Sequence, residues 1–263
     1  MSTYLFDNAA VEANDRFVSL ERCYDHATIS RLEALGIGEG WRCLEVGGGG
    51  GSIARWLSER VGDAGSVLAT DIDPEKMYGQ AGNLTITRHD IVDDPLPEAE
   101  YDLVHARLVL IHVAQREAVV KRLLSTLKPG GWLLLDEFDL TCKMPVLVSP
   151  APGAPALVDK VVDGIHTLLE TAGMSRTWAV EAPQTLHDAG YVDLGQYGFS
   201  EAWQGGSVGA HLHRANALQV SAQLVERGIV SQAEVDGFVE LLEHPGILLS
   251  SYLLLSTWGR RPA

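Results

Sequence analysis

The strongest constraint on this chain is a run of five glycines, residues 47–51. It follows a short apolar segment, residues 41–46 (WRCLEV), predicted to be a buried strand, and precedes a helix predicted over residues 52–60. Glycines in such a turn allow positive φ and close approach of the backbone to a ligand. The next helix offers unpaired N–H groups to polar or anionic atoms. The run therefore favours a cofactor-binding turn. The alternative is a tight turn that binds no ligand. In that case, nothing would explain why the chain bears the entropy cost of ordering five glycines on folding.

Strands and helices alternate on both sides of this turn. A helix is predicted upstream over residues 11–35, where apolar residues recur at helical spacing. Downstream, strands are predicted over residues 66–70, 84–88, 101–106 and 132–135, with a helix over residues 115–127. Such alternation is typical of βαβ units, which build a parallel sheet covered on both faces.

The regular alternation of strands and helices ends after residue 139. A segment rich in proline and glycine, residues 144–155, predicts a loop leading away from the sheet. The elements expected after it are a helix over residues 156–171, a strand over 191–203, one helical stretch over about 208–242 and a last strand over 247–258. The architecture expected is one α/β domain with helical additions towards the C-terminus.

The net charge, the apolar stretches and the cysteine content limit which partners and sites this chain can have. The 263 residues carry a formal net charge of −15, which repels a phosphate backbone and argues against nucleic-acid binding. The longest apolar stretch is too short for a membrane span of about 20 residues. An odd count of 3 cysteines without a CxxC pair argues against disulfides and thiolate zinc sites. Because the start of the chain also lacks the features of a secretory signal, we expect a cytoplasmic protein with no membrane partner.

Three carboxylates accompany the glycine run. Glu45 lies inside the strand before it, Asp71 ends the second strand and Asp90 ends the third. Carboxyl ends of parallel strands form the rim at which open α/β sheets bind ligands, and a carboxylate after the second strand can accept both hydroxyls of a ribose. Each residue alone could instead cap a helix or lie in solvent. Their joint spacing favours binding of a nucleoside.

These motifs together resemble the class I S-adenosylmethionine-dependent methyltransferases. Residues 45–51 (EVGGGGG) resemble the family's first motif, E/D-x-G-x-G-x-G, and residues 67–74 (VLATDIDP) the second. Residues 88–90 (RHD) match the third, residues 101–106 (YDLVHA) the fourth strand and residues 127–133 (LKPGGWL) the turn into the fifth. The resemblance covers about residues 40–140 in the family's order.

The resemblance implies a fold and a set of binding residues. The fold is a Rossmann-like seven-stranded mixed sheet whose last strand, here residues 247–258, runs antiparallel between strands five and six. Glu45 would bind the amino group of S-adenosylmethionine, directly or through water. Asp71 would bind the ribose and Asp90 the adenine amino group. The other implied cofactor-binding residues are Gly47, Gly48, Gly49, Gly51, Ile72, Ile91, Ala106 and Arg107.

Methyl transfer is an in-line displacement, so the protein must chiefly hold the acceptor near the methyl group and exclude water. A phenol, hydroxyl or acidic carbon would benefit from a general base, whereas a carboxylate or amine would need little help. His112, just beyond the fourth strand, is the first candidate for that base, with a packed histidine as the alternative. Glu137 is the second candidate for the base, among acidic residues that could equally be structural.

The pair His211 and His213 is not expected to bind metal, because no acidic or cysteine cluster completes a site.

The sequence thus predicts methylation of a small organic molecule, and we expect a role in secondary metabolism. A non-methylating rearrangement or cyclisation, partner binding without catalysis and an NAD-dependent dehydrogenase are the alternatives. The chain divides into an N-terminal helical cover (residues 1–38), a cofactor-binding core (39–140) and the remainder of the sheet (141–263). Helical segments at about 144–180 and 207–245 are expected to cap the acceptor.

Overall fold

The computed structural model describes residues 11–77 and 82–263. The chain forms two compact units, and it passes between them several times. The first unit lies within Met1–Tyr24, Leu140–Arg176 and Ser200–Leu253. The second lies within Asp25–Asp139, Thr177–Phe199 and Leu254–Ala263. The helix α1 (Val11–Ala34) contributes to both.

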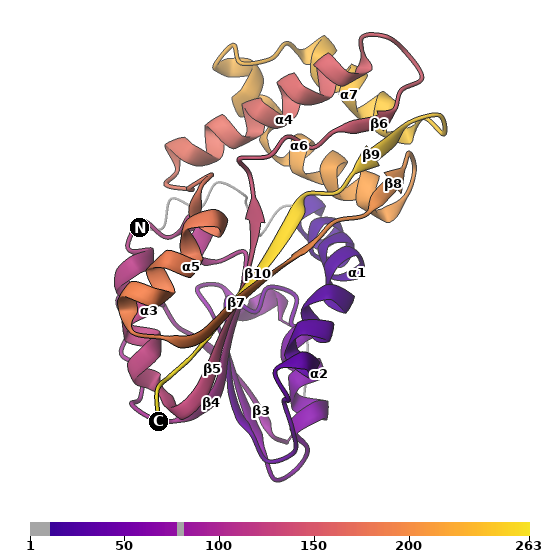
Figure 1. Ribbon diagram of the computed structural model, residues 1–263. Coiled ribbons are helices and arrows are strands. Elements are labelled where there is room, and N and C mark those ends of the chain that lie inside the picture. The colour runs from indigo at the N-terminus through magenta and orange to yellow at the C-terminus, as the bar shows by residue number, and fades with distance from the viewer. Residues whose placement is uncertain (1–10, 78–81) are drawn as a thin grey trace. The chain divides into compact units, whose positions relative to one another are not determined.

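The second unit is built on a seven-stranded mixed sheet in the order β3-β2-β1-β4-β5-β10-β7 (Figure 1). Its strands are β1 (Arg42–Val46), β2 (Ser66–Asp71), β3 (Leu84–Arg88), β4 (Tyr101–Arg107), β5 (Leu127–Asp139), β7 (Val192–Phe199) and β10 (Leu253–Arg260). β1 to β5 pair in parallel, and β10 pairs antiparallel to β7. The predicted fold class and the placement of the last strand between the fifth and sixth sheet strands are therefore confirmed.

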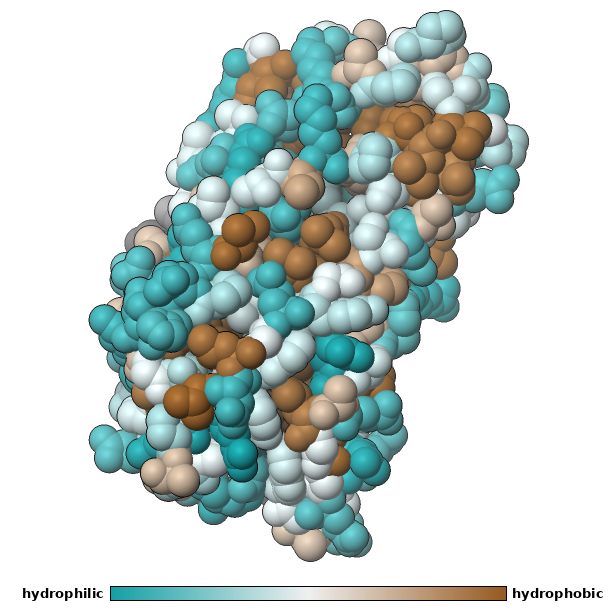
Figure 2. Space-filling model, viewed as in Figure 1, coloured by the Kyte–Doolittle hydropathy of each residue, from teal (hydrophilic) through white to brown (hydrophobic). Residues whose placement is uncertain are grey.

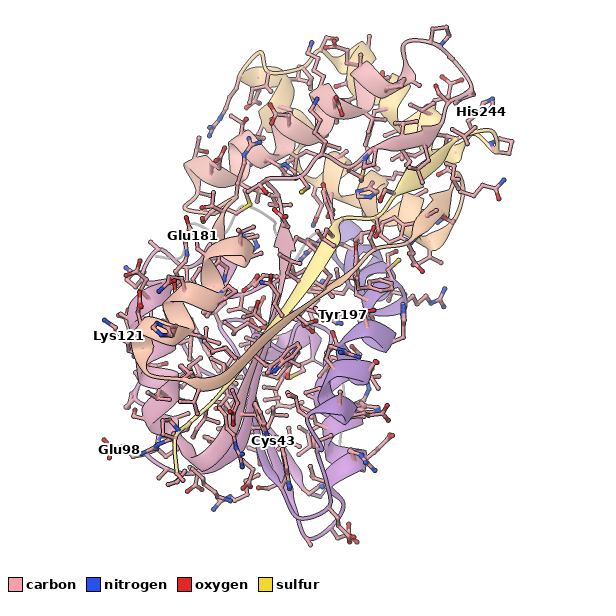
Figure 3. The ribbon with its side chains drawn as sticks, viewed as in Figure 1. Cys43, Glu98, Lys121, Glu181, Tyr197 and His244 are labelled. Atoms are coloured by element: carbon pink, nitrogen blue, oxygen red, sulfur yellow. The ribbon has the colours of Figure 1, made fainter. Side chains whose placement is uncertain are left out.

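Helices cover the two faces of this sheet. α2 (Ser52–Val61) packs beside β1 and β2, while α3 (Arg116–Thr126) and α5 (Trp178–Ala189) pack beside β5 on the opposite face (Figure 1). One core cluster joins the C-terminal part of α1 to α2 and the sheet through Leu32, Leu57 and Leu103, all fully buried. Cys43 of β1 lies in the same cluster (Figure 3). Burial of each such side chain contributes about 1.5–3 kcal/mol, so this packing fixes the strands that carry the site.

The first unit has its own small sheet and helices. β6 (Val146–Val148), β9 (Leu248–Ser250) and β8 (Ala202–Gln204) form a three-stranded antiparallel sheet in that order. The helices α4 (Ala154–Thr171), α6 (Val208–Glu226) and α7 (Gln232–Glu243) pack against one another (Figure 1). Ser231 and Glu234 form a capping box that starts α7.

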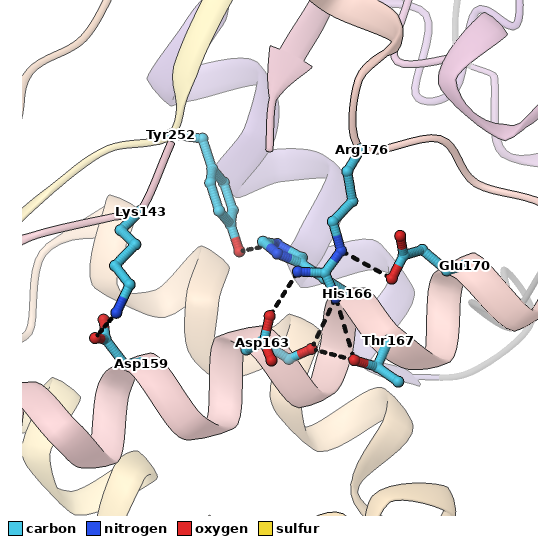
Figure 4. Close-up of polar contacts among 8 residues, drawn as sticks. All are labelled: Lys143, Asp159, Asp163, His166, Thr167, Glu170, Arg176 and Tyr252. Atoms are coloured by element: carbon cyan, nitrogen blue, oxygen red, sulfur yellow. Dashed lines mark hydrogen bonds and ion pairs between the residues drawn. The ribbon is translucent and has the colours of Figure 1, made fainter. Parts of the chain in front are cut away.

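Polar side chains join α4 to the segment that follows it (Figure 4). Arg176 bonds Asp163 at 2.5 Å and Glu170 at 2.8 Å. The buried His166 lies 3.3 Å from the hydroxyl of Tyr252 through Nε2. Arg176 therefore ties the loop after α4 back onto the helix with charge-assisted hydrogen bonds.

Several expected elements differ from those observed. The strand expected over residues 247–258 is divided between β9 of the small sheet and β10 of the large one, because Ser251 and Tyr252 interrupt the pairing. The helical stretch expected over residues 208–242 is two helices, since Gly228 has a φ of +66° between them. The expected loop 144–155 contains β6, and α5 was not predicted at all.

The surface retains some exposed apolar residues. Leu147 and Val148 of β6 are 50% and 54% exposed, and Figure 2 shows hydrophobic surface in this region. Tyr197 lies on β7, the last strand of the large sheet (Figure 3), and the guanidinium of Arg31 lies 4.3 Å from the centre of the Tyr197 ring.

Among the helices of the described residues, none combines the length and apolarity that a membrane crossing requires.

Candidate cofactor-binding site

The glycine turn joins β1 to α2 in a conformation that only glycine adopts readily. Gly47, Gly49 and Gly51 have φ of +66°, +55° and +86°, values in the left-handed region where a Cβ is unfavourable. The N–H groups of Gly47 and Gly48 both donate to the carbonyl of Thr70, at 2.7 and 3.0 Å. These bonds hold the turn against the end of β2.

Neighbouring side chains also restrict this turn, strictly at position 47 and less strictly at position 48, where the contact is the flexible end of Met77. A Cβ at position 47 would lie 2.3 Å from Cγ2 of Val109, and one at position 48 would lie 2.6 Å from Cε of Met77. Gly50 and Gly51 are buried, while Gly47, Gly48 and Gly49 are partly exposed. Bare backbone is therefore presented at the surface of the turn, beside the N-terminus of α2.

Asp71 ends β2 beside the glycine turn. Its Oδ2 accepts from the N–H of Gly49 at 3.1 Å, and its Oδ1 accepts from the N–H of Asp73 at 3.0 Å. Burial raises the pKa of this carboxyl, and the backbone hydrogen bonds oppose that rise. Because each carboxylate oxygen can accept a second hydrogen bond, both oxygens retain capacity for hydroxyl groups of a ligand.

An aliphatic side chain and a second acid follow. Ile72 is 38% exposed, which is unusual for isoleucine, and it offers apolar surface directly after Asp71. Asp90 follows β3, the neighbour of β2, and its Oδ1 accepts from the N–H of Val92 at 2.8 Å. Ile91 is buried. The structure therefore places Asp71 and Asp90 at the same edge of the sheet.

Glu45 belongs to a buried ionic network that the sequence did not predict. Its Oε2 lies 2.6 Å from Nδ1 of His105, and Nε2 of that ring lies 3.4 Å from Oδ2 of Asp136. Burial alone lowers the pKa of His105, but the charges and hydrogen bonds of Glu45 and Asp136 outweigh this effect and raise it to about 9. The same histidine lowers the pKa of Asp136 against the effect of burial. His105 therefore lies between two carboxyl groups and contacts one with each ring nitrogen.

The network continues to α1. The hydroxyl of Thr28 donates to Oδ2 of Asp136 at 2.6 Å. Arg107 donates to the same hydroxyl at 3.3 Å and pairs with Asp25 at 2.8 Å. Arg107, predicted to bind the cofactor, thus contacts the N-terminal helix, and the predicted Ala106 is fully buried. No regular spacing connects these residues, so only the folded strands bring them together.

The segment after β4 carries the candidate base. Leu108 has a φ of +56°, a costly conformation for a residue with a Cβ, and its N–H donates to the carbonyl of Asp136 at 2.8 Å. A short 3₁₀ helix, η2 (Leu110–His112), follows and ends in His112, which is partly exposed. Strained backbone at such a position is a common feature of functional sites.

Glu137, the second predicted catalytic residue, supports η2. Its Oε1 accepts from the N–H groups of Leu110 and Ile111 at 2.9 and 3.2 Å and from Nε1 of Trp178 at 3.3 Å. The side chain is 1% exposed, and burial raises the pKa of Glu137 to about 8. Its contacts are those of a residue that positions the segment bearing His112. A direct proton-transfer role for Glu137 remains a prediction.

Glu137→Gln is expected to reduce the loss of stability with rising pH. The folded protein binds the Glu137 proton more tightly than the unfolded chain, because burial raises its pKa from 4.5 to about 8. Glu137 therefore costs stability as the pH rises from about 4.5 to about 8, by on the order of 1.4 kcal/mol per pH unit. The amide oxygen of glutamine keeps an acceptor for η2 and carries no charge. Urea unfolding from pH 5 to 8 should show the variant gaining stability relative to wild type, and parallel curves would refute this account.

The arrangement suits a nucleoside with a charged extension. Asp71 and Asp90 supply acceptors for hydroxyl and amino groups, Ile72 supplies apolar surface, and the glycine turn presents open backbone at the ends of β1, β2 and β3. Within residues 11–77 and 82–263, no cluster of three or more His, Cys, Asp or Glu side chains has the geometry of a metal site.

Comparisons with known proteins identify the family of this chain. A family model described as a methyltransferase domain matches residues 20–188. Methyltransferase str2 of Strobilurus tenacellus is 32% identical over 111 residues, which span 42% of this chain and 40% of that protein. The ubiquinone/menaquinone biosynthesis C-methyltransferase UbiE of Pseudomonas putida is 33% identical over 116 residues, spanning 41% and 45%. The matched segments thus span less than half of these curated relatives.

A solved structure shares the fold across the whole chain. Phosphoethanolamine N-methyltransferase 2 of Haemonchus contortus, in complex with S-adenosyl-L-methionine, superposes with a TM-score of 0.59 at 14% identity. The superposition covers 100% of this chain and 60% of that one. At this identity, the likeness establishes the fold.

Proposed function

This chain belongs to the methyltransferase domain family, and from that premise we propose that it transfers the methyl group of S-adenosylmethionine to a small organic acceptor. The observation that carries the proposal is the meeting of the glycine turn, Asp71 and Asp90 at the carboxyl ends of three neighbouring strands. In an open α/β sheet, this edge is where ligands bind.

Each group has a role in holding the cofactor. Asp71 would accept hydrogen bonds from the ribose hydroxyls, and Ile72 would pack on the adenine. Asp90 would accept from the adenine amino group. Glu45 would bind the amino group of the methionine portion, close to Gly47, Gly48, Gly49 and Gly51. The bound cofactor supplies an activated methyl group on a sulfonium.

A small acceptor is supported by one relative, the C-methyltransferase of ubiquinone/menaquinone biosynthesis. The chain's net charge of −15 disfavours a nucleic-acid acceptor. We propose His112 as the general base for an acceptor that must lose a proton, and Glu137 holds the helix that carries it. Cytoplasmic location, a role in secondary metabolism and capping of the acceptor by segments 144–180 and 207–245 remain predictions.

The test of this function is formation of S-adenosylhomocysteine. The protein is incubated with S-adenosylmethionine and a panel of phenols, hydroxy acids, amines and carboxylic acids, and both products are followed by mass spectrometry. Acceptor-dependent formation of S-adenosylhomocysteine together with a product heavier by one methylene unit supports the proposal. Conversion of an acceptor without consumption of the cofactor would indicate a non-methylating rearrangement or cyclisation instead.

His112→Ala is expected to lower turnover by about 10²–10⁴-fold, the usual contribution of a general base. The dissociation constant for S-adenosylmethionine should change little, because the proposed role of His112 is toward the acceptor. Single-turnover rates and calorimetric affinities separate the two effects. His187→Ala is the control, since His187 lies on α5 with its side chain 70% exposed. An unaltered rate in His112→Ala would eliminate it as the base.

A further inference from the structure

His105 is a fully buried histidine of β4 whose two ring nitrogens both face carboxylates. Glu45 lies on β1 directly opposite it in the parallel register, and Asp136 lies on β5, on the other side of β4. Glu45 is 3% exposed and Asp136 is fully buried. Two carboxylates at this depth repel each other unless a cation separates them. The ring of His105, whose pKa is raised by these two neighbours, lies between them.

The network lies directly beneath the glycine turn. Glu45 precedes Gly47 by two residues, and a Cβ added to Gly48 would lie 3.7 Å from Cγ of Glu45. The bond from Nδ1 of His105 engages Oε2 of Glu45, which leaves the second carboxylate oxygen for another donor. His105 therefore fixes the direction in which the second oxygen of Glu45 faces.

Hydrogen bonds also restrain Asp136, the partner on the Nε2 side of the His105 ring. Thr28 donates to Oδ2 of Asp136 at 2.6 Å, and Arg107 donates to the hydroxyl of Thr28. The ring is consequently restrained from β1, β5 and α1 at once. A group whose rotamer is locked in this way can hold its partner within a fraction of an ångström.

We propose that His105 is a positioning residue for the methionine end of the cofactor: held between Glu45 and Asp136, it orients the Glu45 carboxyl group beneath the glycine turn. The inference rests on the proposed function, since it assumes that Glu45 receives the amino group of S-adenosylmethionine. His105 itself touches no ligand in this account.

The test compares two ligands that differ only at the methionine end. S-adenosylhomocysteine carries the amino acid portion, whereas 5′-methylthioadenosine has the same nucleoside and sulfur without it. In His105→Gln, which keeps a donor but has no charge, the dissociation constant for S-adenosylhomocysteine should rise about 10- to 100-fold, as expected when charge-assisted bonds are lost. The dissociation constant for 5′-methylthioadenosine should stay within about twofold. A purely structural role would weaken both ligands alike and would overturn the inference.

A double-mutant cycle tests whether His105 acts through Glu45. The variant carrying both Glu45→Gln and His105→Gln should bind S-adenosylhomocysteine no more weakly than Glu45→Gln alone, because the two residues act as one unit. Additive losses would contradict the inference. His187→Gln, on the exposed surface of α5, is the matched control and should bind both ligands as the wild type does.

The wild-type protein provides a measurement that needs no substitution. Ring nitrogen NMR signals of His105 should shift when S-adenosylhomocysteine binds and stay in place when 5′-methylthioadenosine binds. Equal responses to both ligands would overturn the inference even if His105→Gln does not fold. A wild-type protein that binds neither ligand would instead contradict the proposed function, so the two failures are distinguishable.

Discussion

Gly47→Ala is expected to remove most of the affinity for S-adenosylmethionine. The new Cβ would lie 2.3 Å from Cγ2 of Val109, at a residue whose φ is +66°. An alanine there is strained on both counts, and the backbone conformation alone costs on the order of 1–3 kcal/mol. The turn must therefore shift, and with it the N–H groups that bond Thr70 and Asp71. We expect a loss of affinity of about tenfold or more, measured by calorimetry.

Gly82→Ala is the matched control for this substitution. Gly82 lies in the same unit, in a turn before β3, and nothing would lie within 4 Å of its new Cβ. Its affinity for the cofactor and its melting temperature should match the wild type. Wild-type affinity in a folded Gly47→Ala protein would show that the glycine turn does not contact the cofactor.

Asp71→Ala is expected to weaken cofactor binding by about 1.5–3 kcal/mol, or roughly 10- to 100-fold. The carboxylate holds Gly49 and Asp73 through their N–H groups and retains capacity for two hydroxyls. Alanine removes all of these acceptors. Asp71→Asn keeps one oxygen and should fall between the alanine variant and the wild type.

The exposed Asp63, in the turn between α2 and β2, provides the control. Asp63→Ala removes the same charge from the second unit without touching the site, so its affinity should be unchanged. Equal affinities in Asp71→Ala and the wild type would exclude Asp71 as the ribose ligand. Equal losses in Asp71→Ala and Asp63→Ala would assign the effect to net charge alone.

The strands of the sheet were largely predictable from local patterns, whereas the place of the last strand came from the family resemblance. Each short apolar run between turn residues became a strand, and residues 84–88 have the same bounds in the prediction and in β3. The expected fifth strand, residues 132–135, extends in β5 from Leu127 to Asp139. Pro129, Gly130 and Gly131 suggested a turn there, yet pairing with β4 continues on both sides of a register shift.

The first unit was harder to predict from sequence. β6, β8 and β9 are three-residue strands drawn from positions about 50 to 100 residues apart. Such short strands show no periodicity of their own and form only through long-range pairing. The apolar run of residues 247–258 looked continuous because both of its halves are strands, in two different sheets.

The buried parts of the site depended on tertiary contacts. The glycine turn, Asp71 and Asp90 lie at strand ends that the sequence located. His105 instead lay within a strand, and neither composition nor spacing placed it beside Glu45 and Asp136. Glu137 was predicted only as a candidate catalytic acid, and its bonds to Leu110 and Ile111 become visible only in the folded chain.

The most direct test of the central claim is calorimetric titration of the purified protein with S-adenosylmethionine, S-adenosylhomocysteine and NAD in parallel. The account predicts saturable one-to-one binding of the first two ligands and none of NAD. It also predicts that Asp71→Ala weakens both interactions. Binding of NAD alone would contradict the account and assign the glycine turn to a dehydrogenase. Absence of binding with all three ligands would contradict the proposed cofactor site.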